Sequence, residues 1–232
     1  MKVYALSDLH LSFMVNKPMD VFGEHWDNYE ERVKENVNNI LTSDDILLIA
    51  GDISWAMNMP ETQKDFEYIA SLNGKKIIIR GNHDYWWKSI TRIREVLPQN
   101  VYALQNDAIK IGSYVICGTR GWVVPERGKT LGAEDQKIFD RELIRLELAL
   151  IDARAKAEPG DEIICMLHYP PFNSELEESQ FTNLIDRYSA SKVVYGHLHG
   201  YTKISPTEPV EINGVKYYLT SCDKLRCVPK EI

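Results

Sequence analysis

The sequence lacks any hydrophobic run near the ~18 residues that a membrane-spanning helix requires. Its first residues, MKVYALSDLH, pass from a short apolar segment directly to polar residues. They contain neither the apolar core nor the small-residue cleavage site of a signal peptide. We therefore expect a cytoplasmic protein with no membrane partner.

Cysteine is also scarce, with four residues in a chain of 232 and no C-x-x-C spacing. This pattern indicates neither a disulfide framework nor a zinc ribbon. We interpret all four cysteines as reduced thiols. Cys222 and Cys227 are near enough in sequence to form a redox pair, but we favour the interpretation that both are exposed and have no role.

An excess of positive charge is missing too, since 27 Lys and Arg residues face 34 Asp and Glu residues and the net charge is −7. Proteins that coat nucleic acids usually carry the opposite balance, so nucleic acid is disfavoured as a partner, although a local basic groove is not excluded. The composition, 44% hydrophobic and 26% charged, is typical of globular proteins. With no repeat and no Ser- or Gly-rich linker, residues 1–232 are expected to form a single domain.

Short apolar runs alternate with amphipathic stretches along the chain, which predicts an α/β fold. The predicted strands are Val3–Leu6, Ile46–Ala50, Lys76–Ile79, Tyr114–Cys117, Ile163–Leu167 and Val193–Tyr195. The predicted helices are Trp26–Leu41, Thr62–Leu72, Asp84–Leu97 and Glu134–Ala157. Near the C-terminus, Asn213-Gly214 separates two strand-like runs and predicts an antiparallel hairpin, so the sheet system should be mixed. Two long loops, residues 12–24 and 120–132, either shape a binding site or are plain surface.

Residues that can bind metal follow five of the predicted strands. The segments are Asp8-Leu9-His10, Gly51-Asp52, Gly81-Asn82-His83-Asp84, His168 and Gly196-His197-Leu198-His199. Strand ends on one edge of an α/β sheet converge on a crevice, so side chains distant in sequence can meet there. Any one of these segments alone would not indicate metal binding. Five strand ends that all supply Asp, Asn or His are not explained by coincidence.

The residue types indicate a pair of divalent ions. Carboxylates and neutral imidazoles suit Mn, Fe, Zn or Ni, while the lack of Cys argues against structural zinc and the many imidazoles argue against calcium. The seven candidate ligands exceed what one tetrahedral ion uses, and one carboxylate can bridge two ions. The candidates are Asp8, His10, Asp52, Asn82, His168, His197 and His199. Two such ions would attract a phosphate although the chain is acidic.

These motifs, D-x-H, G-D, G-N-H-D, a later H and G-H-x-H in this order, resemble those of the calcineurin-like metallophosphoesterase superfamily. The resemblance extends from Asp8 to His199 and implies a four-layer α-β-β-α sandwich of two mixed β-sheets flanked by helices. It also implies two divalent ions, with Mn or Fe favoured, and a phosphoester hydrolase in which a hydroxide bridging the two ions attacks phosphorus.

The resemblance further implies a role for each matched residue. Asp52 would bridge the two ions, and His83 would not be a ligand but would stabilise the transition state or protonate the leaving oxygen. The first ion would be held by Asp8, His10, Asp52 and His199. The second would be held by Asp52, Asn82, His168 and His197.

Departures from the resemblance narrow the substrate. The D-R-G part of the serine/threonine phosphatase motif is missing after Gly51-Asp52, which disfavours a phosphoprotein. The motifs look closer to those of bacterial-type predicted phosphohydrolases, so we expect a small phosphorylated substrate, nucleotide-like ones included. Monoesters and diesters both stay open. The alternatives are a nuclease of the recombination-repair type and a non-catalytic scaffold, which we rank last because every motif ligand is present.

A few further residues have two interpretations each. We favour Asp84 as the cap of the helix expected to begin there. His25 and Arg80 are left outside the site, whereas Arg120 is either a phosphate clamp or a surface charge. Several aromatic residues lie near the motifs and either stack a nucleobase or pack in the core, and for Trp86 and Trp87 we favour packing.

Overall fold

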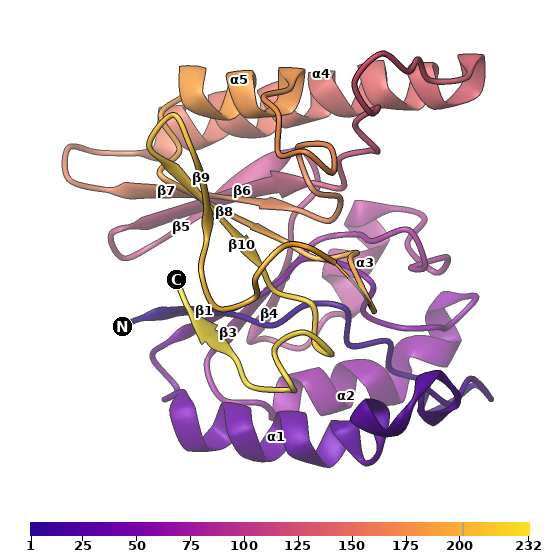
Figure 1. Ribbon diagram of the computed structural model, residues 1–232. Coiled ribbons are helices and arrows are strands. Elements are labelled where there is room, and N and C mark those ends of the chain that lie inside the picture. Colours follow the sequence, from indigo (N-terminus) through magenta and orange to yellow (C-terminus); the bar gives the residue numbers. More distant parts are fainter. Residues whose placement is uncertain (201) are drawn as a thin grey trace.

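The computed structural model describes residues 1–200 and 202–232 and has four layers. Two β-sheets lie face to face, with α1 (Tyr29–Ile40) and α2 (Gln63–Ser71) outside one sheet and α4 (Ala133–Lys156) and α5 (Gln180–Arg187) outside the other (Figure 1). The predicted four-layer α/β sandwich is therefore confirmed. Within the described part of the chain, no helix combines the length and apolar content needed to cross a membrane.

The N-terminal sheet has the strand order β11-β1-β2-β3-β4. Its strands are β1 (Val3–Ala5), β2 (Ile46–Ile49), β3 (Lys75–Ile78), β4 (Val101–Ala103) and β11 (Lys230–Glu231). The first four run parallel, while β11 pairs antiparallel with β1 at the edge. The carboxyl ends of the four parallel strands therefore meet at one edge of this sheet.

The C-terminal sheet has the order β5-β6-β7-β8-β10-β9. Its strands are β5 (Asp107–Ile111), β6 (Tyr114–Thr119), β7 (Glu162–Leu167), β8 (Lys192–Tyr195), β9 (Val210–Ile212) and β10 (Val215–Leu219). Strands β6, β7, β8 and β10 are parallel, and the outer strands are antiparallel to them. The predicted mixed pairing and the Asn213-Gly214 hairpin are thus confirmed.

Side chains alternate between two hydrophobic cores along each central strand. In β2, Leu47 and Ile49 face α1 and α2, whereas Ile46 and Leu48 face the other sheet. Because both faces of the strand are covered, its sequence is apolar at every position. The layer between the sheets also contains Ile116, Ile164 and Met166, and this shared core is what docks one sheet on the other.

Three of the four predicted helices lie within a few residues of their observed bounds, but the one expected over Asp84–Leu97 was wrong. Only Ile90–Val96 forms a helix, α3, and the residues before it form turns. The carboxylate of Asp84 accepts hydrogen bonds from the backbone N–H groups of Ile53 and Ser54, so it binds a neighbouring segment and does not cap a helix. The short strands β4 and β5 and helix α5 were not predicted.

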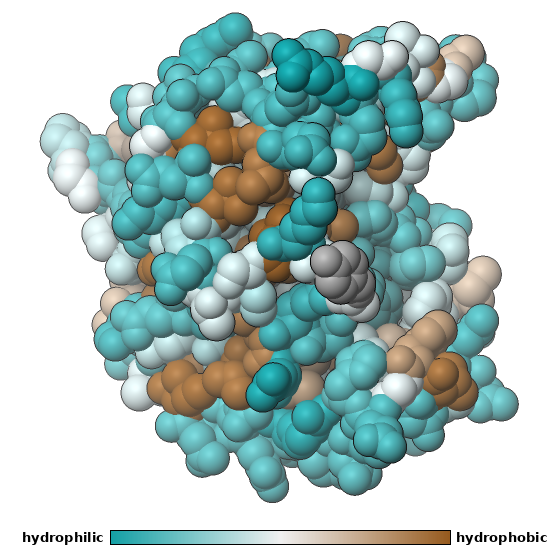
Figure 2. Space-filling model, in the orientation of Figure 1, coloured by the Kyte–Doolittle hydropathy of each residue, from teal (hydrophilic) through white to brown (hydrophobic). Residues whose placement is uncertain are grey.

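The C-terminal cysteines are buried, which corrects the expectation that they are exposed. Cys222 and Cys227 belong to the core beneath α1 and α2, and their sulfur atoms lie 3.6 Å apart as free thiols. The N–H of Cys222 donates to the carbonyl of Ser7, which ties this segment to the end of β1. On the molecular face shown in Figure 2, hydrophilic side chains predominate and hydrophobic ones form separate patches.

Candidate metal centre

The structure brings all seven predicted ligands together where the parallel strands of both sheets end. Two groups of three offer ligand atoms within 4.8 Å of one another, namely Asp8 with His10 and His199, and Asp8 with Asp52 and His168. Each group contains residues that follow strands of both sheets. Asn82 and His197 complete the cluster through close contacts with His168.

The backbone at these strand ends is unusual and requires glycine beside it. Asp8, His10, Asp52 and His197 all have left-handed backbones, with φ between 47° and 70°. Non-glycine residues rarely adopt this conformation, and they do so mainly at functional sites. Gly81 and Gly196 leave the space for the carboxylates, because a Cβ atom there would lie 2.1 Å from Asp52 Oδ1 and 2.3 Å from Asp8 Oδ2.

In the half of the cluster that contains Asn82, His168 and His197, potential ligand atoms lie within hydrogen-bond distance of one another. Asn82 Oδ1 lies 2.6 Å from His168 Nε2 and 2.9 Å from His197 Nδ1. His168 is fully buried, and its Nδ1 atom lies 2.9 Å from the carbonyl oxygen of Ala50. A hydrogen bond of this kind fixes the ring of a metal-ligating histidine and leaves Nε2 to face the ion.

The other half is more open and is held by a residue that the sequence analysis missed. His10 Nε2 and His199 Nε2 lie 3.3 Å apart, and His199 Nδ1 lies 2.8 Å from Asp223 Oδ1. The side chain of His199 is 34% exposed, while that of His10 is 4% exposed. Asp223 follows β10 at the same edge of the sheet, so the strand-end pattern itself would have identified it.

The two carboxylates differ in ionisation although they are neighbours. Burial raises the pKa of Asp8 to about 6, against the attraction of nearby histidines. Burial also opposes the ionisation of Asp52, but His168 and His10 outweigh it and lower the pKa of Asp52. Asp52 Oδ2 lies 3.8 Å from His10 Nε2 and 3.4 Å from His168 Nε2, between the two halves of the cluster.

His10 and His197 present neutral nitrogen donors, and donors of this kind fit divalent ions. Burial lowers the pKa of His10 to about 3 and that of His197 to about 4. His10 Nδ1 is buried and has no hydrogen-bond partner among the described residues. Carboxylate oxygens and neutral imidazole nitrogens that face one another without intervening donors are what borderline divalent metals bind.

His83 lies beside the cluster and is fixed at its backbone. Its N–H donates to Asp52 Oδ1 at 2.8 Å, and its ring centroid lies 4.5 Å from that of Trp55. Asp84 holds the same turn, since it also accepts from Gly81 N at 2.7 Å and from Trp86 Nε1 at 3.2 Å. Asp84 therefore orients the segment that carries Asn82 and His83.

An aromatic cavity of about 420 Å³ opens beside His83 and His10. Trp55 stacks on the His10 ring at a centroid distance of 4.9 Å. His25, which the sequence analysis left outside the site, also lines this cavity. The loop of residues 12–24 contributes Met19 and Phe22, so this loop shapes the cavity. By contrast, Trp86 and Trp87 are buried in the core, as expected.

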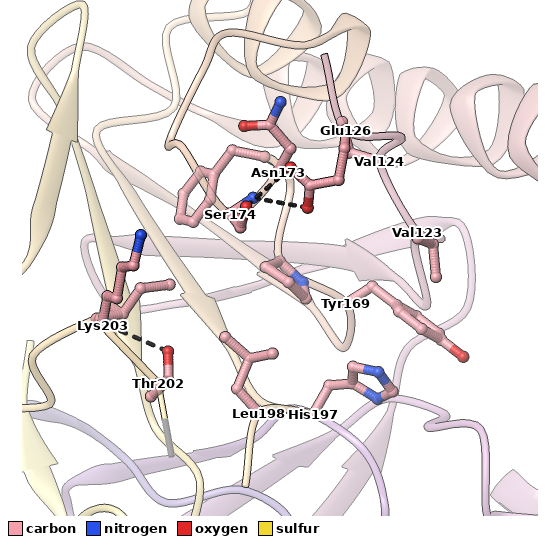
Figure 3. A pocket seen from close by; sticks show the side chains of 13 residues that line it. Val123, Val124, Glu126, Tyr169, Asn173, Ser174, His197, Leu198, Thr202 and Lys203 are labelled. Atoms are coloured by element: carbon pink, nitrogen blue, oxygen red, sulfur yellow. Dashed lines mark hydrogen bonds between the residues drawn. The ribbon is translucent and has the colours of Figure 1, made fainter. Parts of the chain in front are cut away.

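A second cavity of about 420 Å³ borders the cluster on the side of His197. Figure 3 shows the His197 ring next to Tyr169, and the two ring centroids lie 4.1 Å apart. Hydrophobic side chains form much of the lining, including Val124, Phe172 and Leu198, while Glu126 and Lys203 add charge. Val123 to Glu126 come from the loop of residues 120–132, so both long loops line cavities at the cluster.

Three solved structures share the fold at low sequence identity. A phosphopantetheinyl hydrolase from Mycobacterium tuberculosis superposes with a TM-score of 0.57 at 16% identity, covering 100% of this chain and 95% of that one. The protein TT1561 of Thermus thermophilus gives 0.57 at 12% identity, with 99% and 97% covered. A protein of unknown function, AQ665, from Aquifex aeolicus gives 0.54 at 14% identity, with 99% and 95% covered.

Sequence comparison identifies the family. An uncharacterized protein, MJ1445, of Methanocaldococcus jannaschii is 28% identical over 131 residues, which cover 53% of this chain and 66% of that relative. This chain thus spans slightly less than two thirds of the length of that curated relative. The family model of calcineurin-like phosphoesterases matches residues 1–201, a range that contains all seven candidate ligands and His83. The chain belongs to the calcineurin-like phosphoesterase family.

Proposed function

We propose that this protein hydrolyses a small organic phosphodiester at a pair of divalent ions, with manganese or iron favoured. Membership of the family implies metal-dependent phosphoester hydrolysis, and the substrate class and the ion pair are our inference. The observation that carries it is the convergence of two carboxylates, four ligand histidines and one asparagine at the edge where both sheets end.

Asp52 is the residue that we assign to both ions. Its Oδ2 atom lies within 4 Å of a histidine from each half of the cluster. The first ion would be held by Asp8, His10, Asp52 and His199, and the second by Asp52, Asn82, His168 and His197. When bound, the two ions supply an activated water as the nucleophile and positive charge for the transition state.

His83 is assigned to the reacting phosphoryl group. Burial lowers its pKa, so the ring is mainly neutral near pH 7 and has one N–H group available to donate a hydrogen bond. Its Nδ1 atom is buried and lacks a hydrogen-bond partner among the described residues. A positioned donor of this kind stabilises the charge that develops in the transition state.

The two cavities favour a diester over a monoester. The aromatic cavity borders His10, His83 and His199, whereas the second cavity borders His197. A phosphodiester carries two organic groups, and each cavity can take one of them. The aromatic side chains of the first cavity suit a flat ring such as a nucleobase.

Hydrolysis of two chromogenic esters tests the proposal. Metal-stripped protein is reloaded with manganese and assayed on nitrophenyl phosphate and bis(nitrophenyl) phosphate. We expect turnover that requires manganese and is faster on the diester. Preference for the monoester would refute the diester assignment, and silence on both esters with two ions bound would favour a non-catalytic scaffold. The nuclease alternative predicts DNA binding that weakens steeply with salt.

A further inference from the structure

A separate pocket of about 200 Å³ lies at the carboxyl ends of β3, β4 and β6, against α4. We call this cavity the arginine pocket. Its charged lining residues are Arg80, Lys88, Arg120, Arg141, Glu142 and Arg145. None of the predicted metal ligands belongs to it. Its volume is several times the ~30 Å³ that one water molecule occupies in the liquid, so a polyatomic ion can enter.

Glu142 does not neutralise the positive charge of the arginine pocket. Its carboxylate is fully buried, and Oε1 lies 2.7 Å from Arg145 Nη1. The same oxygen lies 3.7 Å from Arg120 Nη2 and 3.8 Å from Arg141 Nε. One carboxylate thus lies near three guanidinium groups. The lining contains five cationic residues and one acidic residue, so the formal net charge of the pocket is +4. This local charge is opposite in sign to the net −7 of the chain.

Two guanidinium groups that line the pocket each have a buried N–H donor without an acceptor in the described part of the chain. The Nε atoms of Arg80 and Arg120 are buried and have no hydrogen-bond partner among the described residues. A buried donor without an acceptor costs free energy, so a side-chain shift that brings either Nε atom to an anion in the pocket would be stabilising. Arg120 is also held in place, because its guanidinium carbon lies 4.6 Å from the centroid of the Trp122 ring.

The arginine pocket adjoins the candidate metal centre through the backbone. Arg80 directly precedes the Gly81-Asn82-His83 segment. The carbonyl oxygen of Arg120 accepts from the N–H of His168 at 2.9 Å and from that of Tyr169 at 3.1 Å. An anion in the pocket would therefore lie beside the site of hydrolysis without touching the ions.

We propose that the arginine pocket binds a phosphoryl anion, either a second phosphate group of the substrate or free phosphate. Guanidinium groups present forked donors that match phosphate oxygens in pairs, and such charge-assisted hydrogen bonds are among the strongest in proteins. Four arginines around one cavity provide more of these donors than Glu142 can use. Anion binding itself does not rest on the proposed function, because it requires neither ions nor turnover, whereas its assignment to a substrate group does.

Calorimetric titration of the metal-stripped full chain with inorganic pyrophosphate tests the site, since without ions the metal centre offers no competing phosphate site. We expect one saturable site per chain. The double variant Arg141→Gln/Arg145→Gln should weaken it at least tenfold. The matched control Lys137→Gln/Arg154→Gln removes two charges from the same helix outside the pocket and should bind like the parent. Absence of saturable binding, or equal weakening in the control, would overturn the proposal.

A milder variant guards against misfolding, because Arg145 pairs with a buried carboxylate. Lys88→Gln leaves every contact of Glu142 in place and should weaken pyrophosphate binding about threefold to tenfold. Unchanged binding in this variant and in a folded double variant would refute the site. The manganese-loaded enzyme then identifies the source of the anion. A raised KM for an ester with a second phosphate, but not for one without it, indicates a substrate group, whereas unchanged KM values with lost pyrophosphate binding indicate free phosphate.

Discussion

The two sheets contribute differently to the candidate metal centre. The N-terminal sheet supplies both carboxylates, Asp8 and Asp52, together with Asn82 and His10, whereas the C-terminal sheet supplies only histidines. Neither sheet alone offers a complete set for either ion. The buried layer between them, with Leu48 and Ile164 in its centre, is thus as necessary to the site as the ligands.

Because the ligands proposed for each ion come from both sheets, we expect metal to bind only when the two sheets are packed together. A bound ion would link strand ends that belong to different halves of the chain. Ligands that bind only the folded state stabilise it by mass action.

Asp52→Asn should have the largest effect, because Asp52 lies between the two halves of the cluster. We expect both ions to be lost and turnover to fall at least about 10³-fold. Elemental analysis of the manganese-loaded variant measures the first effect, and a chromogenic ester measures the second. Asp44→Asn, an exposed substitution of the same chemistry, is the control. Retention of two ions by the Asp52 variant would show that Asp52 does not bridge.

His83→Ala should separate chemistry from metal binding. The side chain lies beside the cluster and is not assigned to either ion, so both ions should remain while kcat falls about 10²- to 10⁴-fold. Steady-state kinetics together with elemental analysis tests this expectation. Loss of an ion from this variant would mean that His83 is a ligand.

Asp223→Ala should weaken only the first ion. Asp223 orients His199, and removal of such a supporting carboxylate typically lowers metal affinity about 10- to 100-fold. Manganese titration should show one weakened and one unchanged site. Equal weakening of both sites would indicate a general disturbance of the fold and would contradict the role of Asp223 in orienting His199.

Metal removal should abolish turnover, and it should also produce the smallest effect of the series, a loss of thermal stability. At an ion concentration 100 times the Kd, each bound ion stabilises the folded state by about 2.7 kcal/mol, which corresponds to a shift in Tm of roughly 5–10 °C per ion for a chain of this size. Thermal unfolding with and without manganese measures the shift. In Asp52→Asn the shift should disappear, and if it persists there the ions do not join the sheets through Asp52.

The convergence of the candidate ligands could be predicted from the sequence because each lies just after an apolar strand. The strand pattern is local, and parallel strands bring their ends to one edge whatever lies between them. The roles of the ligands and the single-domain organisation stay predictions.

Other features depend on contacts between distant segments. Asp84 was misjudged because its hydrogen-bond partners Ile53 and Ser54 lie about 30 residues away. The burial of Cys222 follows from the packing of the C-terminal segment against the end of β1, which no local pattern indicates. The arginine pocket combines the ends of three strands with α4, and so its charge concentration is invisible in an acidic composition.

The count of bound ions against activity tests the central claim most directly. Metal-stripped protein is titrated with manganese while ester hydrolysis and bound metal are followed together. We expect activity to rise to its maximum when two ions are bound per chain. Full activity with a single ion, or none with two, would contradict a dinuclear centre shared by the two sheets.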